Sequence, residues 1–392
     1  MKFNIWKDCP KVPITELLTF IVDNRGKTVP TADDGWKLIA TNCVTNNTLF
    51  PVYEKVRYLT QETYETWFRA HPIPGDILFV NKGTPGRVCM VPDPVDFCIA
   101  QDMIALRADD KKIYNKYLFA VLRSREIQQQ IYNTNVGDVI PHFKKQFMDQ
   151  LLIPVPERKI QEAIGNLYYQ LSYKMELNKK INENLEQQAQ ALYHHMFVEN
   201  TSSVWKGGVL SDIADITMGQ SPSGSSYNED GEGTIFFQGR AEFGFRFPSI
   251  RLYTTEPKRM ACANDVLMSV RAPVGDLNVA HTDCCIGRGL AAIHSKTGQQ
   301  SFVLYTMFAL KEQLNVFNGE GTVFGSINRN SLNDMPIIIP SPDSISAFED
   351  IVAPIDAAIR NNYDEICRLT KLRDSLLPKL MSGELDVSTL DI

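Results

Sequence analysis

Long apolar runs are absent from this 392-residue chain. No stretch approaches the roughly 18 consecutive apolar residues that a membrane-spanning helix needs, and the first residues lack the apolar core of a signal peptide. The sequence therefore predicts no membrane segment and a protein of the cytoplasm.

The eight cysteines lack the spacing of a metal site or a disulfide framework. No Cys-x-x-Cys pair occurs, and the adjacent Cys284-Cys285 suits neither a zinc site nor a set of disulfides. We expect reduced thiols, mostly in the core, and no metal.

Several stretches match a known catalytic motif only in part. Gly26-Lys27-Thr28 resembles the end of a phosphate-binding loop, but Ile21 stands where that loop requires glycine. The stretch 219–223 ends in serine where a nucleophile elbow has its last glycine. His194-His195 lacks the carboxylate of a zinc protease motif, and Asp93-Pro94-Val95 lacks the second proline and the aromatic ring of a methyltransferase amine-binding motif. The sequence favours binding over catalysis.

The net charge of −6 is concentrated at the C-terminal end of the chain. Residues 342–392 carry 10 Asp and Glu against 5 Lys and Arg, which accounts for −5 of that total. A basic surface elsewhere stays possible, but it has to arise from the placement of side chains rather than from composition.

Two long segments repeat the same helical pattern. Apolar residues recur in steps of three and four from Ile160 to Met196 and again from Phe348 to Leu380, which is the period of helices that bury one seam. A shift of 184 positions superimposes the two patterns and places Asn178 on Asn362. A polar seam residue of this kind fixes the register of a helix pair. Proline occurs within the second helix at positions 354 and 378, where we expect a break or a kink.

The segments before the two helices are also repeats. Short matches such as Trp6-Lys7 with Trp205-Lys206 and Gly75–Leu78 with Asn264–Leu267 have offsets that drift from 199 to 184, as loop insertions and deletions produce. Each segment has short strand-like runs, and 114–131 reads as one helix. A duplicated chain predicts a molecule with a pseudo-twofold axis.

The predicted organisation is mixed α/β, with two globular segments and two long antiparallel helices that form a coiled-coil rod. Pro154-Val155-Pro156 and Ser341-Pro342 mark the entries to the helices, and Ser382-Gly383 marks the end of the second. The expected boundaries are 1–156 for the first globular domain, 157–200 for the first helix, 201–341 for the second domain, 342–383 for the second helix and 384–392 for the tail.

This arrangement resembles the specificity subunit of type I restriction–modification enzymes over essentially the whole chain. The most specific stretch is 372–385, Leu-Arg-Asp-Ser-Leu-Leu-Pro-Lys-Leu-Met-Ser-Gly-Glu-Leu, which is similar to that family's usual C-terminal ending. Ile153–Pro156 and Ile339–Pro342 are similar to its domain-to-helix junctions, and Gly75–Leu78 is similar to a block of its recognition domains.

The resemblance implies a DNA-binding subunit of a phage-defence system that has no catalytic activity of its own. Each globular segment would be a target-recognition domain that reads one half of a split, asymmetric double-stranded DNA target, and the helices would set the gap. Two methyltransferase subunits, which would hold S-adenosylmethionine, would dock along the rod, and restriction subunits would join them. No cofactor and no membrane contact are implied for this chain, and the location implied is the nucleoid. The basic stretch 23–28 differs from 217–222, so the two half-targets should differ.

Polar residues on glycine-rich loops after strands are the candidate DNA contacts, because amides, guanidiniums, ammonium groups and hydroxyls read base edges and bind phosphates. Lys82 and Arg271 are the favoured pair, since they occupy equivalent positions in the repeat. The full set of candidate contacts is Lys27, Lys82, Gly86, Gln101, Asn135, Gly137, Gln220, Ser221, Arg240, Arg271, Gly275, Arg288, Gly321, Thr322 and Ser326. The candidate residues of the helix–helix contact are Ile164, Leu167, Leu171, Asn178, Leu185, Leu192, Phe348, Ile355, Asn362, Leu369 and Leu376.

Three other interpretations stay open at this point. The chain could be the specificity part of another phage-defence methylation system, an adaptor whose tandem domains bind proteins through the acidic last helix, or an enzyme with an unrecognised site between its domains. Salt-dependent binding to a split DNA sequence favours a DNA-recognition subunit of a multisubunit enzyme, and turnover by the isolated chain favours an enzyme.

Overall fold

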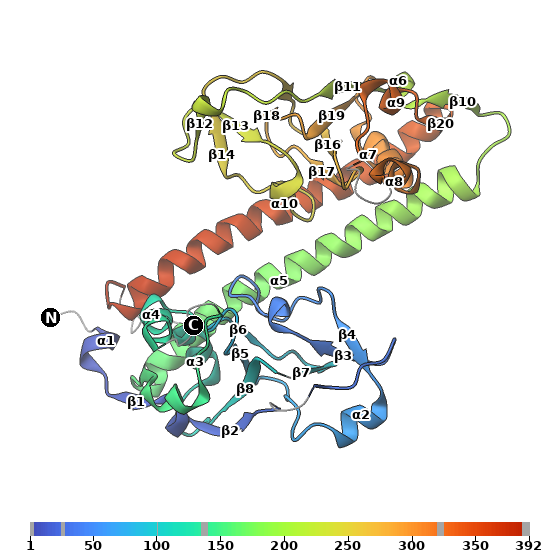
Figure 1. Ribbon diagram of the computed structural model, residues 1–392. Coiled ribbons are helices and arrows are strands. Elements are labelled where there is room, and N and C mark those ends of the chain that lie inside the picture. Colours follow the sequence, from blue (N-terminus) through green and yellow to red (C-terminus); the bar gives the residue numbers. More distant parts are fainter. Residues whose placement is uncertain (1–3, 25–27, 100, 135–139, 320–324, 386–392) are drawn as a thin grey trace. The chain divides into compact units, whose positions relative to one another are not determined.

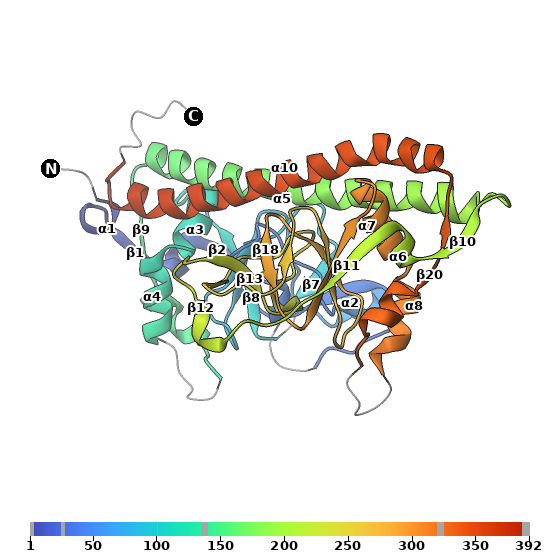
Figure 2. The same cartoon turned by 90° about the horizontal axis from the view of Figure 1, so that it is seen from above.

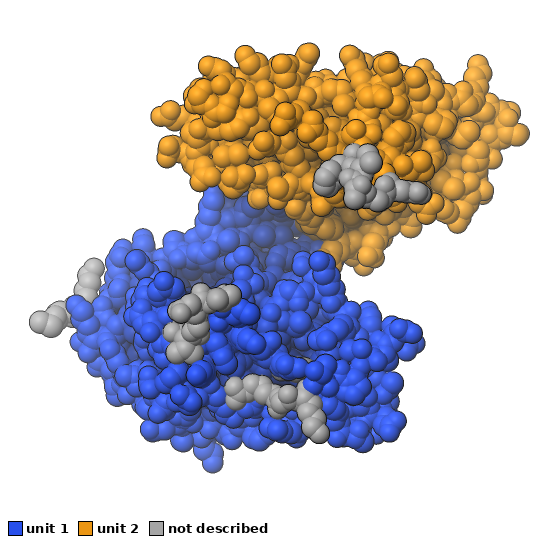
Figure 3. Space-filling model, viewed as in Figure 1, with its two compact units in different colours: residues 1–180, 362–392 blue, residues 181–361 orange. Residues whose placement is uncertain are grey.

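The computed structural model describes residues 4–24, 28–99, 101–134, 140–319 and 325–385 (Figure 1). The chain divides into two compact units (Figure 3). Unit 1 combines residues 1–180 with 362–392, and unit 2 comprises residues 181–361. Each of the two long helices therefore contributes one part to unit 1 and the other part to unit 2.

Unit 1 is built around a four-stranded antiparallel sheet in the order β2-β8-β5-β6. A second sheet has the order β4-β3-β7, with β3 and β7 parallel, and β1 pairs with β9 beside the entry to the long helix. The strands are β1 (Lys11–Pro13), β2 (Leu18–Val22), β3 (Trp36–Ile39), β4 (Arg57–Leu59), β5 (Ile77–Val80), β6 (Val88–Met90), β7 (Phe97–Ile99), β8 (Met103–Ala108) and β9 (Leu152–Pro154). The helices are α1 (Ile5–Asp8), α2 (Gln61–Thr66), α3 (Asn115–Leu122), α4 (Arg125–Thr134) and the first part of α5 (Arg158–His194).

The central strand of unit 1 is apolar at every position because it separates two cores. On β5, Ile77 and Phe79 face a core that includes α3 and the long helices, whereas Leu78 and Val80 face a smaller core under the second sheet. Side chains alternate between the faces of a strand, so a strand covered on both faces has to be apolar throughout.

Unit 2 repeats this plan. Its four-stranded sheet has the order β11-β19-β16-β17, its second sheet the order β12-β14-β13-β18-β15, and β10 pairs with β20. The strands are β10 (Lys206–Val209), β11 (Ala214–Met218), β12 (Tyr227–Asn228), β13 (Thr234–Phe237), β14 (Leu252–Thr254), β15 (Met260–Ala261), β16 (Val266–Ser269), β17 (Leu277–Val279), β18 (Cys284–Ile286), β19 (Leu290–Ser295) and β20 (Pro336–Ile339). The helices are α6 (Leu210–Ile213), α7 (Gln300–Ala309), α8 (Lys311–Asn315), α9 (Arg329–Asn333) and α10 (Pro342–Met381), and α5 continues as a π-helical turn, His195–Glu199.

Backbone hydrogen bonds confirm the internal duplication. In unit 1 the Asn81 N–H donates to the Asp102 carbonyl, and in unit 2 the Val270 N–H donates to the Gly289 carbonyl. These two bonds are related by offsets of 189 and 187, the offsets found in the sequence for these segments. The bond from Phe143 N–H to the Asn81 carbonyl likewise corresponds to that from Ile327 N–H to the Val270 carbonyl.

The two long helices contact each other in both units, as predicted. In unit 1, Asn178 Nδ2 donates to Glu365 Oε2 over 2.7 Å, and in unit 2, Asn182 Nδ2 donates to the Ile359 carbonyl over 3.2 Å. Residue numbers rise along α5 where they fall along α10, so the pair is antiparallel in each unit (Figure 2).

Two details of the helices differ from the expectation. No break occurs in α10, which stays α-helical through Pro354 and Pro378. Both prolines are exposed, so water can bind the carbonyls that their missing N–H groups leave free. The single helix expected over 114–131 is wrong as well, because α3 ends at Leu122 and Ser124 starts α4 by donating to the Val121 carbonyl and accepting from the Ile127 N–H.

Candidate nucleic-acid interface

In unit 1 the candidate contacts lie where β5 ends. The Lys82 N–H donates to the Asp102 carbonyl, and Lys82 Nζ lies 3.8 Å from Asp102 Oδ1, with both side chains 44% exposed. Gln101 precedes this aspartate and is exposed. An ion pair this open to water adds little stability, so the ammonium group stays available to a stronger anion such as a phosphate.

In unit 2 the equivalent edge carries more positive charge. Arg271 follows β16, is exposed and forms an isolated backbone β-bridge with Ser326, which is also exposed. Arg288 is exposed on the turn before β19. The Arg288 N–H donates to Ser221 Oγ over 3.3 Å, which holds the loop of Gln220 and Ser221 against this turn. The structure therefore gathers these five residues at neighbouring strand ends.

Arg240 contacts the loop between β16 and β17, which also carries Arg271. Its guanidinium forms an ion pair with Asp276, which follows Gly275. A cavity of about 340 Å³ adjoins this pair and is also lined by Lys311. Arg240 is already neutralised, so its availability to a phosphate is lower than that of Arg271 or Arg288.

Of the four candidate glycines, the two that the structure describes are buried turn residues. Gly86 and Gly275 have φ angles of +88° and +89°, and a Cβ on either would lie about 3.0 Å from atoms of Gln128 or Leu314. Each N–H donates back across its turn, to the carbonyl of Val80 or Ser269. The glycines hold the loops of Lys82 and Arg271 in shape. Lys27, Asn135, Gly137, Gly321 and Thr322 lie outside the described residues.

The candidate seam residues are buried to different degrees. Ile164 and Phe348 are fully buried at 0% exposure, and so is the side chain of Asn178. The remaining members are partly buried, namely Leu167, Leu171, Leu185, Leu192, Ile355, Asn362, Leu369 and Leu376. Besides Ile164 and Asn178, α5 also buries Tyr168, Ser172 and Tyr193, each one residue after a predicted seam residue, and Met175, Asn182 and Ala189, which are outside the predicted set. The helices pack against each other and also against the globular segments. This second contact changes which face of α5 is buried.

Sequence reasoning missed a buried ionic network in unit 2. Arg246 is 4% exposed, and its guanidinium lies 2.8 Å from Glu186 of α5 and 3.2 Å from Asp356 of α10. Asp356 also accepts from the Tyr305 hydroxyl over 2.9 Å. Burial raises the pKa of Glu186 and of Asp356, and the charge of Arg246 opposes that rise. Acidic residues on two facing helices, Glu186 and Asp356, could have indicated a buried cation between them. The loop of Arg246 has no periodicity from which the direction of its side chain could be predicted.

The Tyr193 hydroxyl of α5 donates to Thr306 Oγ1 of α7 over 3.1 Å. Burial raises the pKa of Tyr193 to about 12. The phenol therefore stays neutral and holds the helix to the globular part of unit 2.

The described residues contain no cluster of His, Cys, Asp and Glu that could hold a metal ion, and none of their helices is long and apolar enough to cross a membrane. Five of the eight cysteines are buried, as expected for thiols in the core: Cys43, Cys89, Cys98, Cys284 and Cys285.

Known proteins resemble this chain in sequence and fold. Residues 10–187 match the family described as the Type I restriction modification DNA specificity domain. The provisionally named type I restriction enzyme MjaX specificity subunit of Methanocaldococcus jannaschii is 29% identical over 86% of this chain and 84% of its own. The type I restriction enzyme HindI specificity subunit of Haemophilus influenzae is 21% identical over 79% and 86% of the two chains. The crystal structure of a type I restriction–modification system S subunit from M. genitalium shares the fold, with a TM-score of 0.57 and 17% identity over 97% and 98% of the two chains.

Proposed function

The chain belongs to the type I restriction–modification specificity subunits, and from that premise we propose that it reads a split, asymmetric DNA target with residues 1–156 and 201–341. The observation that supports this proposal is the duplicated framework, in which equivalent strand ends carry different side chains. Lys82 corresponds to Arg271 and Gln101 to Arg288. Equivalent readers with different side chains would select different bases.

The exposed cations of these edges provide the contacts in the proposal. Lys82 in unit 1 and Arg271 and Arg288 in unit 2 are the principal groups, supported by Gln101, Gln220, Ser221 and Ser326. Arg is the commonest reader of guanine, and Gln is suited to adenine. The candidates Lys27, Asn135, Gly137, Gly321 and Thr322 stay part of the proposed set because they belong to the same glycine-rich segments of the sequence.

We further propose that the two long helices set the gap between the half-targets. At 1.5 Å per residue, a helix of about 40 residues is roughly 60 Å long, more than one turn of B-DNA at about 34 Å. Two methyltransferase subunits, each with S-adenosylmethionine, would dock on this chain, and restriction subunits would complete the complex at the nucleoid. The chain itself supplies recognition only.

Methylome sequencing of cells with and without this chain tests the proposal directly. The expected result is a single bipartite motif with two unlike halves and a fixed gap that loses its methylation when the chain is deleted. A continuous motif, or methylation that persists without the chain, would contradict it. A strain with Lys82→Ala and Arg271→Ala separates loss of recognition from loss of the complex, because Lys82 is half-exposed, Arg271 is exposed and the helices are unchanged.

Two alternative functions are a specificity subunit of another phage-defence methylation system and a non-enzymatic adaptor that binds proteins. The acidic C-terminal residues 342–392 favour a protein partner on α10. Purified chain that binds no split DNA, even with methyltransferase subunits present, would favour the adaptor.

A further inference from the structure

Unit 2 contains a cavity of about 430 Å³ between its globular part and α10. The apolar part of the cavity wall comes from both sides, with Phe247 and Leu304 on the globular part and Ala353 and Ala357 on α10. Cavities of this size that combine an apolar wall with a few polar groups are typical of sites for small molecules.

Unit 1 has large aromatic residues at the positions of the two alanines. The shift of 184 positions that relates the long helices places Tyr169 on Ala353 and Tyr173 on Ala357. The two tyrosine rings stack with their centroids 5.8 Å apart. The Lys116 ammonium group lies 4.3 Å from the centroid of the Tyr169 ring, which places this ring against the start of α3. Unit 1 therefore has two rings where unit 2 has two methyl groups.

A second difference keeps the two helices around the cavity apart. In unit 1, Gly165 of α5 lies so close to α3 that a Cβ there would be 2.5 Å from the Tyr117 nitrogen. The same shift places Glu349 of α10 on this glycine. Glu349 accepts the N–H groups of Ser301 and Phe302 over 3.2 and 3.0 Å, so its side chain lies between α10 and the start of α7. The helices of unit 2 thus cannot approach each other as closely as those of unit 1.

The charged groups of the cavity wall balance one another. They are two guanidiniums, Arg246 and Arg360, and two carboxylates, Glu349 and Asp356. Arg246 is paired with Asp356 at 3.2 Å, and Arg360 Nη1 donates to Asn264 Oδ1 over 2.6 Å. The Asp356 side chain is 21% exposed, and a carboxylate has lone pairs for further hydrogen bonds. The cavity therefore suits a neutral ligand that carries a hydrogen-bond donor.

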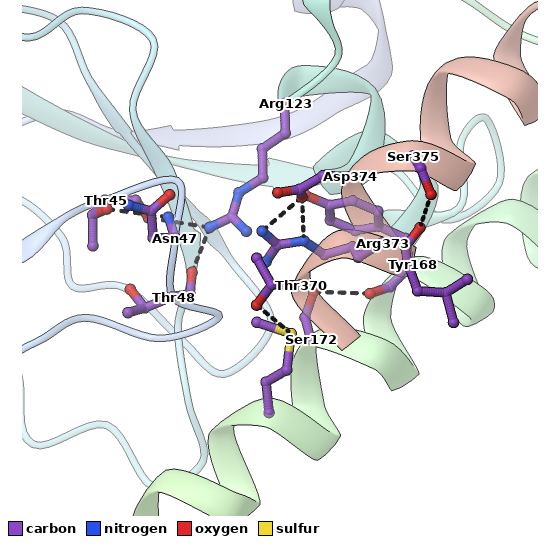
Figure 4. A network of polar contacts seen from close by, with 12 residues as sticks. Thr45, Asn47, Thr48, Arg123, Tyr168, Ser172, Thr370, Arg373, Asp374 and Ser375 are labelled. Atoms are coloured by element: carbon purple, nitrogen blue, oxygen red, sulfur yellow. Dashed lines mark hydrogen bonds and ion pairs between the residues drawn. The ribbon is translucent and has the colours of Figure 1, made fainter. Parts of the chain in front are cut away.

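Unit 1 has no acid at the position of Asp356. The shift places Ser172 there, and the Ser172 hydroxyl donates to the Tyr168 carbonyl over 2.9 Å (Figure 4). Arg123, which Figure 4 also shows, donates through Nη2 to the carbonyls of Thr45 and Val88 over 3.2 and 2.8 Å. The acid and the two small residues thus occur together in unit 2, whereas unit 1 has a hydroxyl and two rings at the same positions.

We propose that this cavity of unit 2 binds a neutral aromatic small molecule of about the size of a phenol. The ring lies against Ala353 and Ala357, where the equivalent positions of unit 1 carry tyrosine rings. Phe247 and Leu304 contact it from the globular part, and aromatic pairs such as that with Phe247 add to the apolar contact. A hydroxyl on the ring donates to the Asp356 carboxylate. The strand-end loops that carry the proposed DNA contacts do not contribute to this site.

Titration of the purified full chain with p-cresol, which is the side chain of tyrosine as a free molecule, tests the site by hydrogen exchange. At ten times its dissociation constant, bound p-cresol should slow exchange that occurs by opening of unit 2 about tenfold in α7 and in 342–361. Exchange in α3 of unit 1 should stay unchanged. The saturated analogue 4-methylcyclohexanol should give a weaker response. No saturable response to p-cresol, or an equal response to the saturated analogue, would overturn the proposal.

Filling the cavity provides the matched variants. Ala353→Tyr and Ala357→Tyr each introduce the residue that unit 1 has, so either should abolish the response to p-cresol. Ala353→Leu, a smaller filling residue, should weaken it and serves if tyrosine unfolds unit 2, which exchange in α7 without p-cresol reveals. Ile351→Tyr is the control, because Ile351 of the same helix is 51% exposed and does not line the cavity. An undiminished response in the filled variants would mean that p-cresol binds elsewhere and would overturn the proposal.

The complex with the methyltransferase subunits separates a free ligand from a side chain of a partner protein. The response of α7 to p-cresol should be the same in the complex as in the isolated chain. Loss of the response on assembly would assign the cavity to a partner's side chain and would overturn the proposal of a small-molecule ligand.

Discussion

Arg246 and Asp356 form an ion pair, Nη1 to Oδ1 3.2 Å, in which the arginine is almost completely buried. The arginine comes from a loop of the globular part of unit 2, the aspartate from α10, and Glu186 of α5 completes the network. This loop is thereby attached to both long helices. Leu49 is the counterpart of Arg246 in unit 1, because the Met90 N–H bonds to the Leu49 carbonyl as the Val279 N–H bonds to the Arg246 carbonyl. The same backbone contact is thus held by apolar packing in one unit and by charge in the other.

Arg246→Leu should destabilise unit 2 by about 3–5 kcal/mol, because it leaves Glu186 and Asp356 buried without their cation. Replacing all three residues with leucine should recover most of that loss, since an apolar cluster has no buried charge. Hydrogen exchange in α7 measures the effect, with α3 of unit 1 as the internal reference. A single variant as stable as the triple variant would mean that the network contributes nothing.

The stability of unit 2 should depend on pH through three buried carboxyls. Burial raises the pKa of Glu186, Glu349 and Asp356, although Arg246 or the N–H groups of α7 oppose it. A carboxyl with a raised folded-state pKa holds its proton more tightly when folded. The contribution of these three groups to stability is therefore fully present below the unfolded pKa of about 4 and is lost as the pH rises through the raised values. Denaturation from pH 4 to 7 should show this decline.

Glu349→Gln isolates one part of that pH dependence. Glu349 accepts the N–H groups of Ser301 and Phe302 at the start of α7, and the amide oxygen of glutamine can replace one acceptor without titrating. The decline in stability with pH should become shallower in the variant. An identical slope would assign the dependence to Glu186 and Asp356 alone.

Gly165→Ala should destabilise unit 1, although alanine favours a helix over glycine by about 1 kcal/mol. A Cβ at this position would lie 2.5 Å from the Tyr117 backbone nitrogen, so α5 and α3 would have to separate. Overpacking of this kind costs about 1–3 kcal/mol. Thermal unfolding and exchange in α3 measure the loss, and Ala163→Gly on the same helix is the control for propensity alone. A stabilised variant would show that the helices can separate without cost.

The sequence predicted the parts of this molecule that rest on periodicity and repetition. The long helices, their contact and the duplicated sheets follow from spacing that survives in the residues themselves. The turn of the buried stripe to Tyr168 and Met175 could not be predicted, because it depends on the tertiary contact of each helix with its globular partner. The partners of Arg123 and Arg246 were also hidden, since loop conformation decides where a guanidinium points. The break expected at Pro354 was wrong, because the free-energy cost of a proline within a helix depends on whether the carbonyl that loses its hydrogen bond reaches water.

Lys82→Ala and Arg271→Ala should each weaken binding to one half of the DNA target. Loss of a base contact should relax one position by about 1–3 kcal/mol, whereas loss of a phosphate contact should lower the affinity for all sequences and reduce the salt dependence. Binding by the assembled complex to libraries randomised in one half-site at a time separates these outcomes. Lys159→Ala, an exposed lysine on α5, is the charge-matched control. Unchanged binding in both variants would show that these loops do not face DNA.

The separation of the half-targets should follow the length of the helices. Removing two heptads from each helix around Asn178 and Glu365 would shorten both by 14 residues, or about 21 Å at 1.5 Å per residue. Because base pairs are about 3.4 Å apart, the gap should shrink by roughly six base pairs while both half-sequences stay the same. The methylation motif of cells that carry the shortened chain measures the gap. Deleting the same length from α5 alone is the control, since it disrupts the antiparallel contact and should abolish methylation. An unchanged gap in the doubly shortened chain would mean that the globular segments, rather than the helices, determine the spacing.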